Sequence, residues 1–256
     1  MARRPARRPS YGTLDTIEYI GPRPQAPKRS NFFGGWVILL IAAGVGVWFV
    51  RPLIPFLRAE QESATSSTAD ALISELAPSP SLGNRVAAAA LQQSKVEISY
   101  DPAYYKIPYP NGDIPSGKGK AEDVIIRTYR AVGLDLQQLV HDDIATHFKD
   151  YPDLWDLKSP DSNIDHRRVQ NLQRFFTRHG AELAISHDPA DYQPGDVVAW
   201  SLANGQAHIG VVVPGPGARR NEPWVIHNMG NSPKWEHALF DFHQIGHYRY
   251  TGQQPK

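Results

Sequence analysis

An uncharged apolar run, Phe32–Val50, constrains this chain more than any other feature of its sequence. Its length matches the roughly 20 residues that cross a hydrocarbon core about 30 Å thick. Trp36 and Trp48 lie near its two ends, where aromatic residues gather at membrane interfaces. We therefore predict a single transmembrane helix at Phe32–Val50. A buried core helix and the apolar part of a cleaved signal peptide are the alternatives.

The charges around this run predict its orientation. Two arginines, Arg51 and Arg58, follow the run, whereas a larger basic group precedes it. By the positive-inside rule the N-terminus is cytoplasmic, which predicts a single-pass protein of the bacterial inner membrane with a periplasmic C-terminal domain. The basic residues that precede the run are Arg3, Arg4, Arg7, Arg8, Arg23, Lys28 and Arg29.

The chain divides into four predicted parts. A basic cytoplasmic tail covers residues 1–31, the transmembrane helix 32–50, a tether 51–84, and one folded domain 85–252. The tether is rich in Ser, Ala, Glu and Pro, with a possible short helix at Ala69–Leu76. The formal net charge of +1 argues against nucleic acid as a partner. Since the chain has no cysteine, disulfides and thiolate metal sites are excluded.

The domain shows two kinds of pattern in succession, helical first and extended second. This order indicates an α+β fold with helices packed on an antiparallel sheet. Apolar residues at helical spacing, with Gly133 and Gly180 as C-caps, predict the helices, and short β-branched runs between Gly and Pro turns predict the strands. The predicted helices are Arg85–Ser94, Ala121–Val132, Leu136–Phe148 and Arg168–His179, and the predicted strands are Val96–Tyr100, Asp196–Ser201, His208–Val213, Trp224–Asn228 and Gly246–Tyr250.

Two histidines lie on neighbouring predicted strands. His208 begins the apolar strand Ala207–Val213, and His227 is near the end of the strand Trp224–Asn228. Because side chains alternate along a strand, His227 and Val225 share one face. Histidines at equivalent depths of adjacent strands can face one cleft, although two ordinary buried or surface histidines are the plain alternative.

The motifs PGDVVAW, AHIGVVV and WVIHN resemble the second half of papain-like cell-wall hydrolases of the NlpC type. More closely, the strings NIDHRRV at 163–169, DVIIR at 123–127 and GHYRY at 246–250 resemble the bacterial family called domain of unknown function 1287. The resemblance covers nearly all of 85–250. It implies a papain-like fold and thiol-dependent hydrolysis of an amide bond in peptidoglycan peptides.

The resemblance also implies a site. The family pattern carries a nucleophilic cysteine two residues before the aspartate that opens the central helix, and Ala121 stands at that place before Asp123. By resemblance His208 is the base and His227 orients it. Since alanine has no nucleophilic atom, we predict that this chain does not hydrolyse the bond. Ala121 is either an engineered replacement of cysteine or a natural loss.

Further side chains are predicted to contact substrate. Arg167 or Arg168 is expected to bind a substrate carboxylate, Tyr104 and Tyr109 to line the groove, and Asp123 to lie beside it. The expected partner is peptidoglycan or its peptides, and a membrane protein is the alternative partner. No cofactor and no metal are expected. The competing hypothesis is a non-catalytic module that binds peptidoglycan or a membrane protein.

A zinc hydrolase is the third hypothesis. The helix Leu136–Phe148 carries His141 and His147, and Asp165, His166 and Asp188 could add ligands. The two histidines are six residues apart, however, so they do not share a helix face as an i, i+4 pair does. Exposed helix faces and helix caps are the simpler explanation for these residues.

Overall fold

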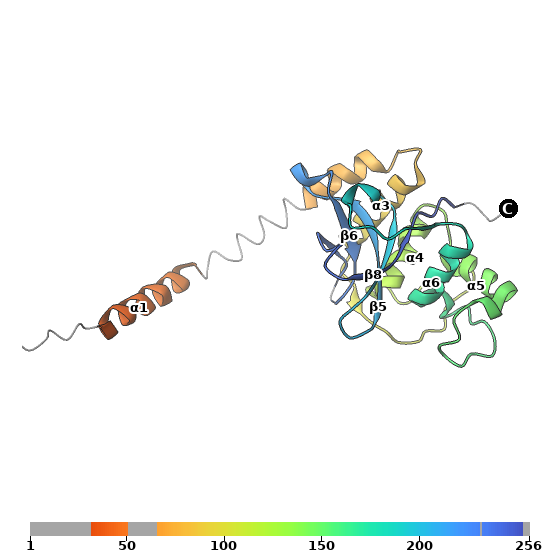
Figure 1. Ribbon diagram of the computed structural model, residues 1–256, viewed down its shortest axis with the longest axis horizontal. Helices are drawn as coiled ribbons and strands as arrows, with labels where there is room; N and C mark the ends of the chain where they lie inside the picture. The colour runs from red at the N-terminus through yellow and green to blue at the C-terminus, as the bar shows by residue number, and fades with distance from the viewer. Residues whose placement is uncertain (1–31, 51–65, 231, 253–256) are drawn as a thin grey trace, which may run out of the picture. The chain divides into compact units, whose positions relative to one another are not determined.

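The computed structural model describes residues 32–50, 66–230 and 232–252 (Figure 1). The chain forms two compact units, Met1–Ile54 and Pro55–Lys256. The first unit contains helix α1, Phe32–Val50. All other described elements belong to the second unit.

The predicted membrane crossing at Phe32–Val50 is corrected by the structure. In the described part of the chain, no helix is long and apolar enough to span a bilayer. A crossing requires a helix with about 20 predominantly apolar residues. The predicted single-pass location in the inner membrane, with a periplasmic domain, is therefore wrong as well. The predicted tail 1–31 and residues 51–65 of the tether lie outside the described residues.

The second unit combines helices with an antiparallel sheet, as the sequence pattern predicts. Glycines with positive φ follow two of the helices, at Gly133 (φ 88°) and Gly180 (φ 63°), as expected for C-caps. After a helix at 66–76, the α-helices are α3 Leu82–Gln93, α4 Ala121–Ala131, α5 Leu136–His147 and α6 Val169–Arg178, and the 3-10 turns are η2 Phe148–Asp150, η3 Asp165–Arg167, η4 Pro189–Asp191 and η5 Gly217–Arg219.

The main sheet has six strands in the order β3-β8-β4-β5-β6-β7, each antiparallel to its neighbours. Its centre is apolar and β-branched, which suits a strand buried on both faces. The strands are β3 Glu182–Leu183, β4 Val197–Ser201, β5 Ala207–Pro214, β6 Pro223–His227, β7 Lys234–Glu236 and β8 His243–Tyr248; a small parallel pair, β1 Ser99–Tyr100 and β2 Lys118–Gly119, lies outside it.

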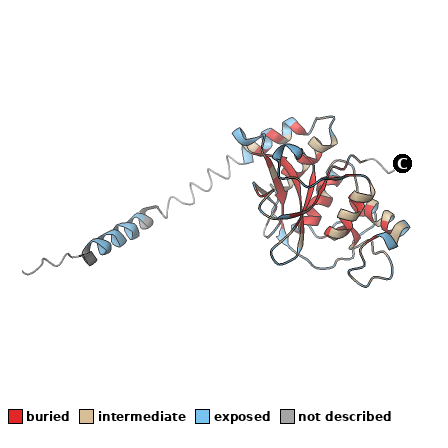
Figure 2. Cartoon of the chain, in the orientation of Figure 1, coloured by how far each residue is buried: buried red, intermediate tan, exposed pale blue. Residues whose placement is uncertain are grey.

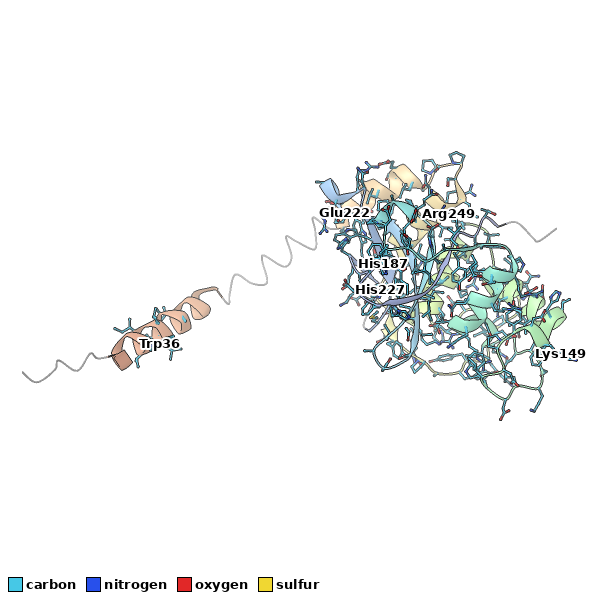
Figure 3. The ribbon with its side chains drawn as sticks, in the orientation of Figure 1. Trp36, Lys149, His187, Glu222, His227 and Arg249 are labelled. Carbon is cyan, nitrogen blue, oxygen red and sulfur yellow. The ribbon has the colours of Figure 1, made fainter. Side chains whose placement is uncertain are left out.

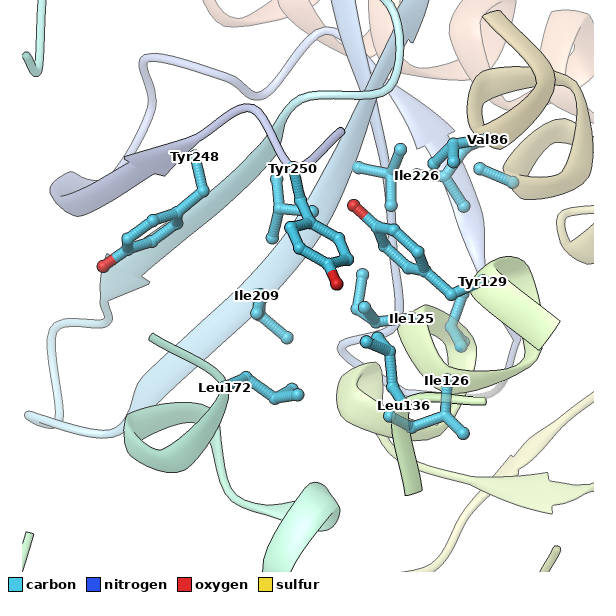
Figure 4. Packing of buried hydrophobic residues seen from close by; sticks show 14 of the residues in the cluster. Val86, Ile125, Ile126, Tyr129, Leu136, Leu172, Ile209, Ile226, Tyr248 and Tyr250 are labelled. Carbon is cyan, nitrogen blue, oxygen red and sulfur yellow. The ribbon is translucent and has the colours of Figure 1, made fainter. Parts of the chain in front are cut away.

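Side chains of the sheet alternate between two apolar clusters. On β5, Ile209 and Val211 belong to the main core with the helices, whereas Val212 belongs to a smaller cluster with Trp200. Figure 4 shows Ile209 of the sheet with Tyr129 of α4 and with the C-terminal Tyr250 in the main core. Figure 2 shows buried residues concentrated in the sheet and on the helix faces against it.

A helix at 66–76 adds to this core. Leu72 and Leu76 are buried in the main cluster, and Ala69 is 2% exposed. This helix lies within the segment predicted as a tether and includes the short helix anticipated at Ala69–Leu76. The folded unit therefore contains chain that precedes residue 85.

The start of α3 is tied to the turn that leads into β4. Gly195 in that turn has φ 90°, a conformation that glycine adopts without strain. A Cβ atom there would lie 2.3 Å from the carbonyl oxygen of Gly83. Only glycine therefore lets the two backbones approach, and this approach fixes the start of α3 against the turn before β4.

Candidate functional site

The two predicted histidines form a hydrogen-bonded pair. Nε2 of His208 lies 3.1 Å from Nδ1 of His227, and both side chains are buried. His208 is the second residue of β5 and His227 ends β6, and the antiparallel register pairs His227 with Gly210. Because Gly210 has no Cβ, the space beside His227 stays open; a Cβ there would lie 3.1 Å from Cβ of His227.

Trp200 of β4 forms one wall of this pair. Its ring stacks on His208 with centroids 5.9 Å apart and an interplanar angle of 27°. The indole N–H donates to the carbonyl of Leu239, which fixes the ring in place. Both imidazoles therefore project from the sheet face that carries Trp200, opposite the face on which Ile209 meets the helices.

A third group extends the pair into a chain. Nε2 of His227 lies 3.2 Å from Oε2 of Glu236, which is 42% exposed on strand β7. Sequence reasoning missed Glu236. The alternation Lys-Trp-Glu after the strand containing His227 was the available signal, because it indicates one more short strand with its polar residues on one face.

The surroundings keep His208 neutral. Burial lowers its pKa to about 3, and the neighbouring His227 adds to this effect. Burial also lowers the pKa of His227, although Glu236 opposes that shift. Nδ1 of His208 has no hydrogen-bond partner among the described residues. The pair thus presents one ring nitrogen that is free to exchange a proton.

Ala121 is the first residue of α4 and is 3% exposed. Asn228, directly after His227, donates from Nδ2 to the carbonyl of Gly119 at 3.4 Å. The end of β6 therefore meets the turn that leads into α4. The peptide N–H groups of a first helical turn have no partner within the helix and carry partial positive charge, so they can bind an anionic oxygen.

The two neighbours of Ala121 form an ion pair. Nζ of Lys120 lies 2.7 Å from Oε1 of Glu122 and also donates to the carbonyl of Arg167 at 2.9 Å. Burial raises the pKa of Glu122, while Lys120 opposes the shift. Since its carboxylate is bound by Lys120, Glu122 does not replace a nucleophile at Ala121.

Asp123 and Arg167 form a fully buried ion pair. Nε and Nη2 of Arg167 donate to the two carboxylate oxygens of Asp123 at 2.7 and 3.1 Å. Nη1 donates to the carbonyl of Ala103 at 2.8 Å. Asp123 also accepts from the backbone N–H of Lys120, as a first-turn carboxylate at a helix start does. Both residues, predicted to bind substrate, therefore hold α4 to the loop before it.

Tyr104 and Tyr109, which were predicted to line the groove, each form a hydrogen bond with an acidic side chain. The Tyr104 hydroxyl donates to Asp161 at 3.0 Å, and the Tyr109 hydroxyl donates to Asp142. Both rings are exposed. Tyr109 also meets the edge of His141, with ring centroids 5.0 Å apart. The structure thus places Tyr109 against α5.

The residues of the zinc hypothesis have separate partners. His141 Nδ1 lies 2.8 Å from Asp165, and His147 lies 3.1 Å from Asp143. Burial lowers the pKa of His166 to about 4, which keeps that ring neutral. Within 32–50, 66–230 and 232–252, no group of three or more His, Asp or Glu side chains is placed to hold a metal ion.

Comparison with known proteins identifies the class. A family model described as a domain of unknown function (DUF1287) matches residues 87–250, and the chain belongs to this family. The curated relative YijF of Escherichia coli (strain K12), described as an uncharacterized protein, is 51% identical over 165 residues. That match covers 64% of this chain and 80% of the relative. No solved structure matches the chain. The family expected from the NIDHRRV string is therefore confirmed.

Proposed function

We propose that this domain has the scaffold of a papain-like thiol amidohydrolase for peptidoglycan peptides, and that in this chain it binds such peptides without cleaving them. The observation that carries the proposal is the chain of His208, His227 and Glu236, in which Nδ1 of His208 has no partner among the residues that the structure describes. Such a chain orients a base for proton transfer in thiol hydrolases. The start of α4 adjoins the end of β6 through Asn228.

The proposed chemistry of the scaffold follows from these groups. The histidines project from the sheet face opposite α4, so this chemistry requires that the start of α4 reach them at the end of β6. A thiol at position 121 would then lose its proton to Nδ1 of His208, and the positive end of α4 would stabilise the thiolate. The thiolate would add to the amide carbonyl, and first-turn N–H groups of α4 would bind the oxyanion. The imidazolium would return the proton to the leaving amine. Water would then hydrolyse the thioester, with His208 again as base.

With alanine at position 121 there is no thiol to deprotonate, so the reaction cannot begin. The groups proposed to bind the substrate remain. Its methyl group has no lone pair, and Glu122 is bound by Lys120. The non-catalytic module is therefore the form of the proposal that applies to the chain as it stands. Free peptide ends and amides remain recognisable, because recognition needs donors and shape but no nucleophile.

The test is the variant Ala121→Cys. We expect it to release peptides from purified peptidoglycan sacculi, detected by mass spectrometry, while Ala121→Ser releases none. Adding His208→Ala to Ala121→Cys should abolish the release. Iodoacetamide should alkylate the new thiol at pH 6 or so, well below the ordinary thiol pKa of about 8.5. If the thiol is alkylated only above pH 8 or so and no peptide is released, the hydrolase scaffold is rejected.

A further inference from the structure

A cavity of about 250 Å³ lies in the helical half of the domain. It is lined by parts of α5, η2, the loop after η2, η3 and the start of α6. Its apolar walls are Ile144, Phe148, Tyr151, Trp155 and Leu157. Figure 3 shows Lys149, another lining residue, on the other side of the domain from His227. The cavity is therefore separate from the histidine pair.

Arg168 is the notable polar side chain of this cavity. Its guanidinium stacks on the ring of Trp155, 4.0 Å from the centroid. Its Nη1 is shielded from solvent and has no hydrogen-bond partner in the described part of the chain. No hydrogen bond from Nε or Nη2 is found there either. The neighbouring Arg167, in contrast, donates from all three of its nitrogens.

Nη1 of this half-buried arginine is shielded from solvent without an acceptor among the described residues, which is costly. Burial lowers the pKa of Arg168, although Asp165 and Asp161 oppose that shift. Arginine remains charged in proteins, so a solvent-shielded N–H group of a half-buried guanidinium is destabilising until an acceptor, such as an anion, binds it. Arginine over an aromatic ring keeps its N–H edge available for a planar, bidentate partner.

The other polar groups that line the cavity are less suited than Arg168 to bind an anion. Oδ2 of Asp165 already accepts from His141 and from the backbone N–H of Asp161. Lys149 and Asp153 also line the cavity, and Lys149 is exposed to solvent. Asn171 donates its side-chain amide to the carbonyl of Asp165. The guanidinium is thus the lining group whose hydrogen-bonding capacity is most clearly unused.

We propose that this cavity binds a small carboxylate that carries an apolar group, with Arg168 pairing the carboxylate and Trp155 and its neighbours covering the apolar part. The volume suits a ligand the size of one acylated amino acid. This site stands independently of the proposed hydrolase scaffold, because none of its residues belongs to the histidine chain.

The test uses two probes that differ in charge alone. N-acetyl-leucine and its neutral amide, N-acetyl-leucinamide, are titrated into the full chain by calorimetry. We expect the carboxylate to bind at least about 10-fold more tightly, as a charge-assisted pair does. Arg168→Gln should weaken the carboxylate to the level of the amide, and Arg168→Lys should restore part of the difference. Trp155→Leu should weaken both probes.

The control is Arg219→Gln. Arg219 also lies over a tryptophan, Trp224, at 5.1 Å from the centroid, but it is outside the cavity. This variant should bind both probes as the parent does. Circular dichroism of each variant confirms folding, and the side-chain N–H signals of Arg168 in NMR should shift only with the carboxylate. Equal affinity for the two probes, no binding of the carboxylate at millimolar concentration, or unchanged binding by folded Arg168→Gln would overturn the proposal.

Discussion

Nε2 of His208 and Nδ1 of His227 lie 3.1 Å apart and share one hydrogen bond across strands β5 and β6. One of the two facing nitrogens must carry a proton and the other must accept it. The hydrogen bond therefore favours states in which at least one ring is neutral. Trp200 covers His208, and Glu236 binds the outer nitrogen of His227. These contacts fix the orientation of both rings. The protonation of the pair should therefore affect measurable properties of the domain.

The first prediction concerns the stability of the domain against pH. The unfolded chain protonates His208 near pH 6.5, but the folded chain holds its pKa at about 3. Between these values the unfolded state binds more protons, so stability falls as pH falls. Urea unfolding at pH 7 and pH 5 should show the parent losing about 1–2 kcal/mol more than His208→Asn. The same loss in both proteins would contradict the prediction.

The second prediction concerns Gly210, which lies between the histidines and Trp200. A Cβ at this position would lie 2.9 Å from the carbonyl oxygen of Ile226 and 3.0 Å from the Trp200 ring. Gly210→Ala should therefore destabilise the domain by about 1–3 kcal/mol and shift the histidine ring signals in NMR. Gly230→Ala is the control, because no atom lies within 4 Å of its Cβ position. Equal effects from both variants would contradict the close packing.

The third prediction concerns the buried pair of Asp123 and Arg167. Asp123→Asn leaves Arg167, which is 0% exposed, without its counter-charge. We expect a loss of about 3–5 kcal/mol in the free energy of unfolding. Asp113→Asn is the matched control, because its pair with Arg127 is 2.8 Å long but Asp113 is 40% exposed. That variant should cost at most about 1 kcal/mol in urea unfolding.

The fourth prediction concerns the helix at 66–76. Leu72→Ala removes a side chain that is 5% exposed in the main core, and large-to-small core changes cost about 2–5 kcal/mol. Glu75→Ala, one turn further on, removes only an exposed ion pair with Arg220. Thermal unfolding should separate the two variants clearly. If Leu72→Ala is as stable as Glu75→Ala, this helix does not belong to the cooperative domain.

Local pattern predicted most of the fold. The apolar spacing of α4 and α6 and the short apolar, β-branched runs of β4, β5 and β6 each follow from a few adjacent residues. Strand β7 was missed because it has three residues, too few for a period to show. The helix at 66–76 was only anticipated in part, since its polar surface resembles a linker and its burial depends on contacts distant in sequence.

The part of the candidate site that depends only on strand register and side-chain alternation was predictable from the sequence. Strand register brings His208 and His227 together, and alternation gives both the same face. The roles of Arg167 and Arg168 were not separable from the sequence. Only the fold shows that Arg167 meets Asp123, 44 positions away, while Arg168 stacks on Trp155. Adjacent arginines carry the same charge, and their different partners depend entirely on tertiary structure.

The last prediction concerns Glu236, which binds the outer nitrogen of His227. Its carboxylate raises the pKa of His227 against the lowering effect of burial, so Glu236→Gln should lower that pKa further. The change should be modest and should shrink in high salt, because Glu236 is 42% exposed and exposed pairs are screened. Histidine NMR titration measures it directly. Glu222→Gln is the control: Glu222 lies 3.6 Å from His237, so its removal should leave His227 unchanged. Equal titration of His227 in the parent and in Glu236→Gln would remove Glu236 from the chain of proton carriers and leave the two histidines alone.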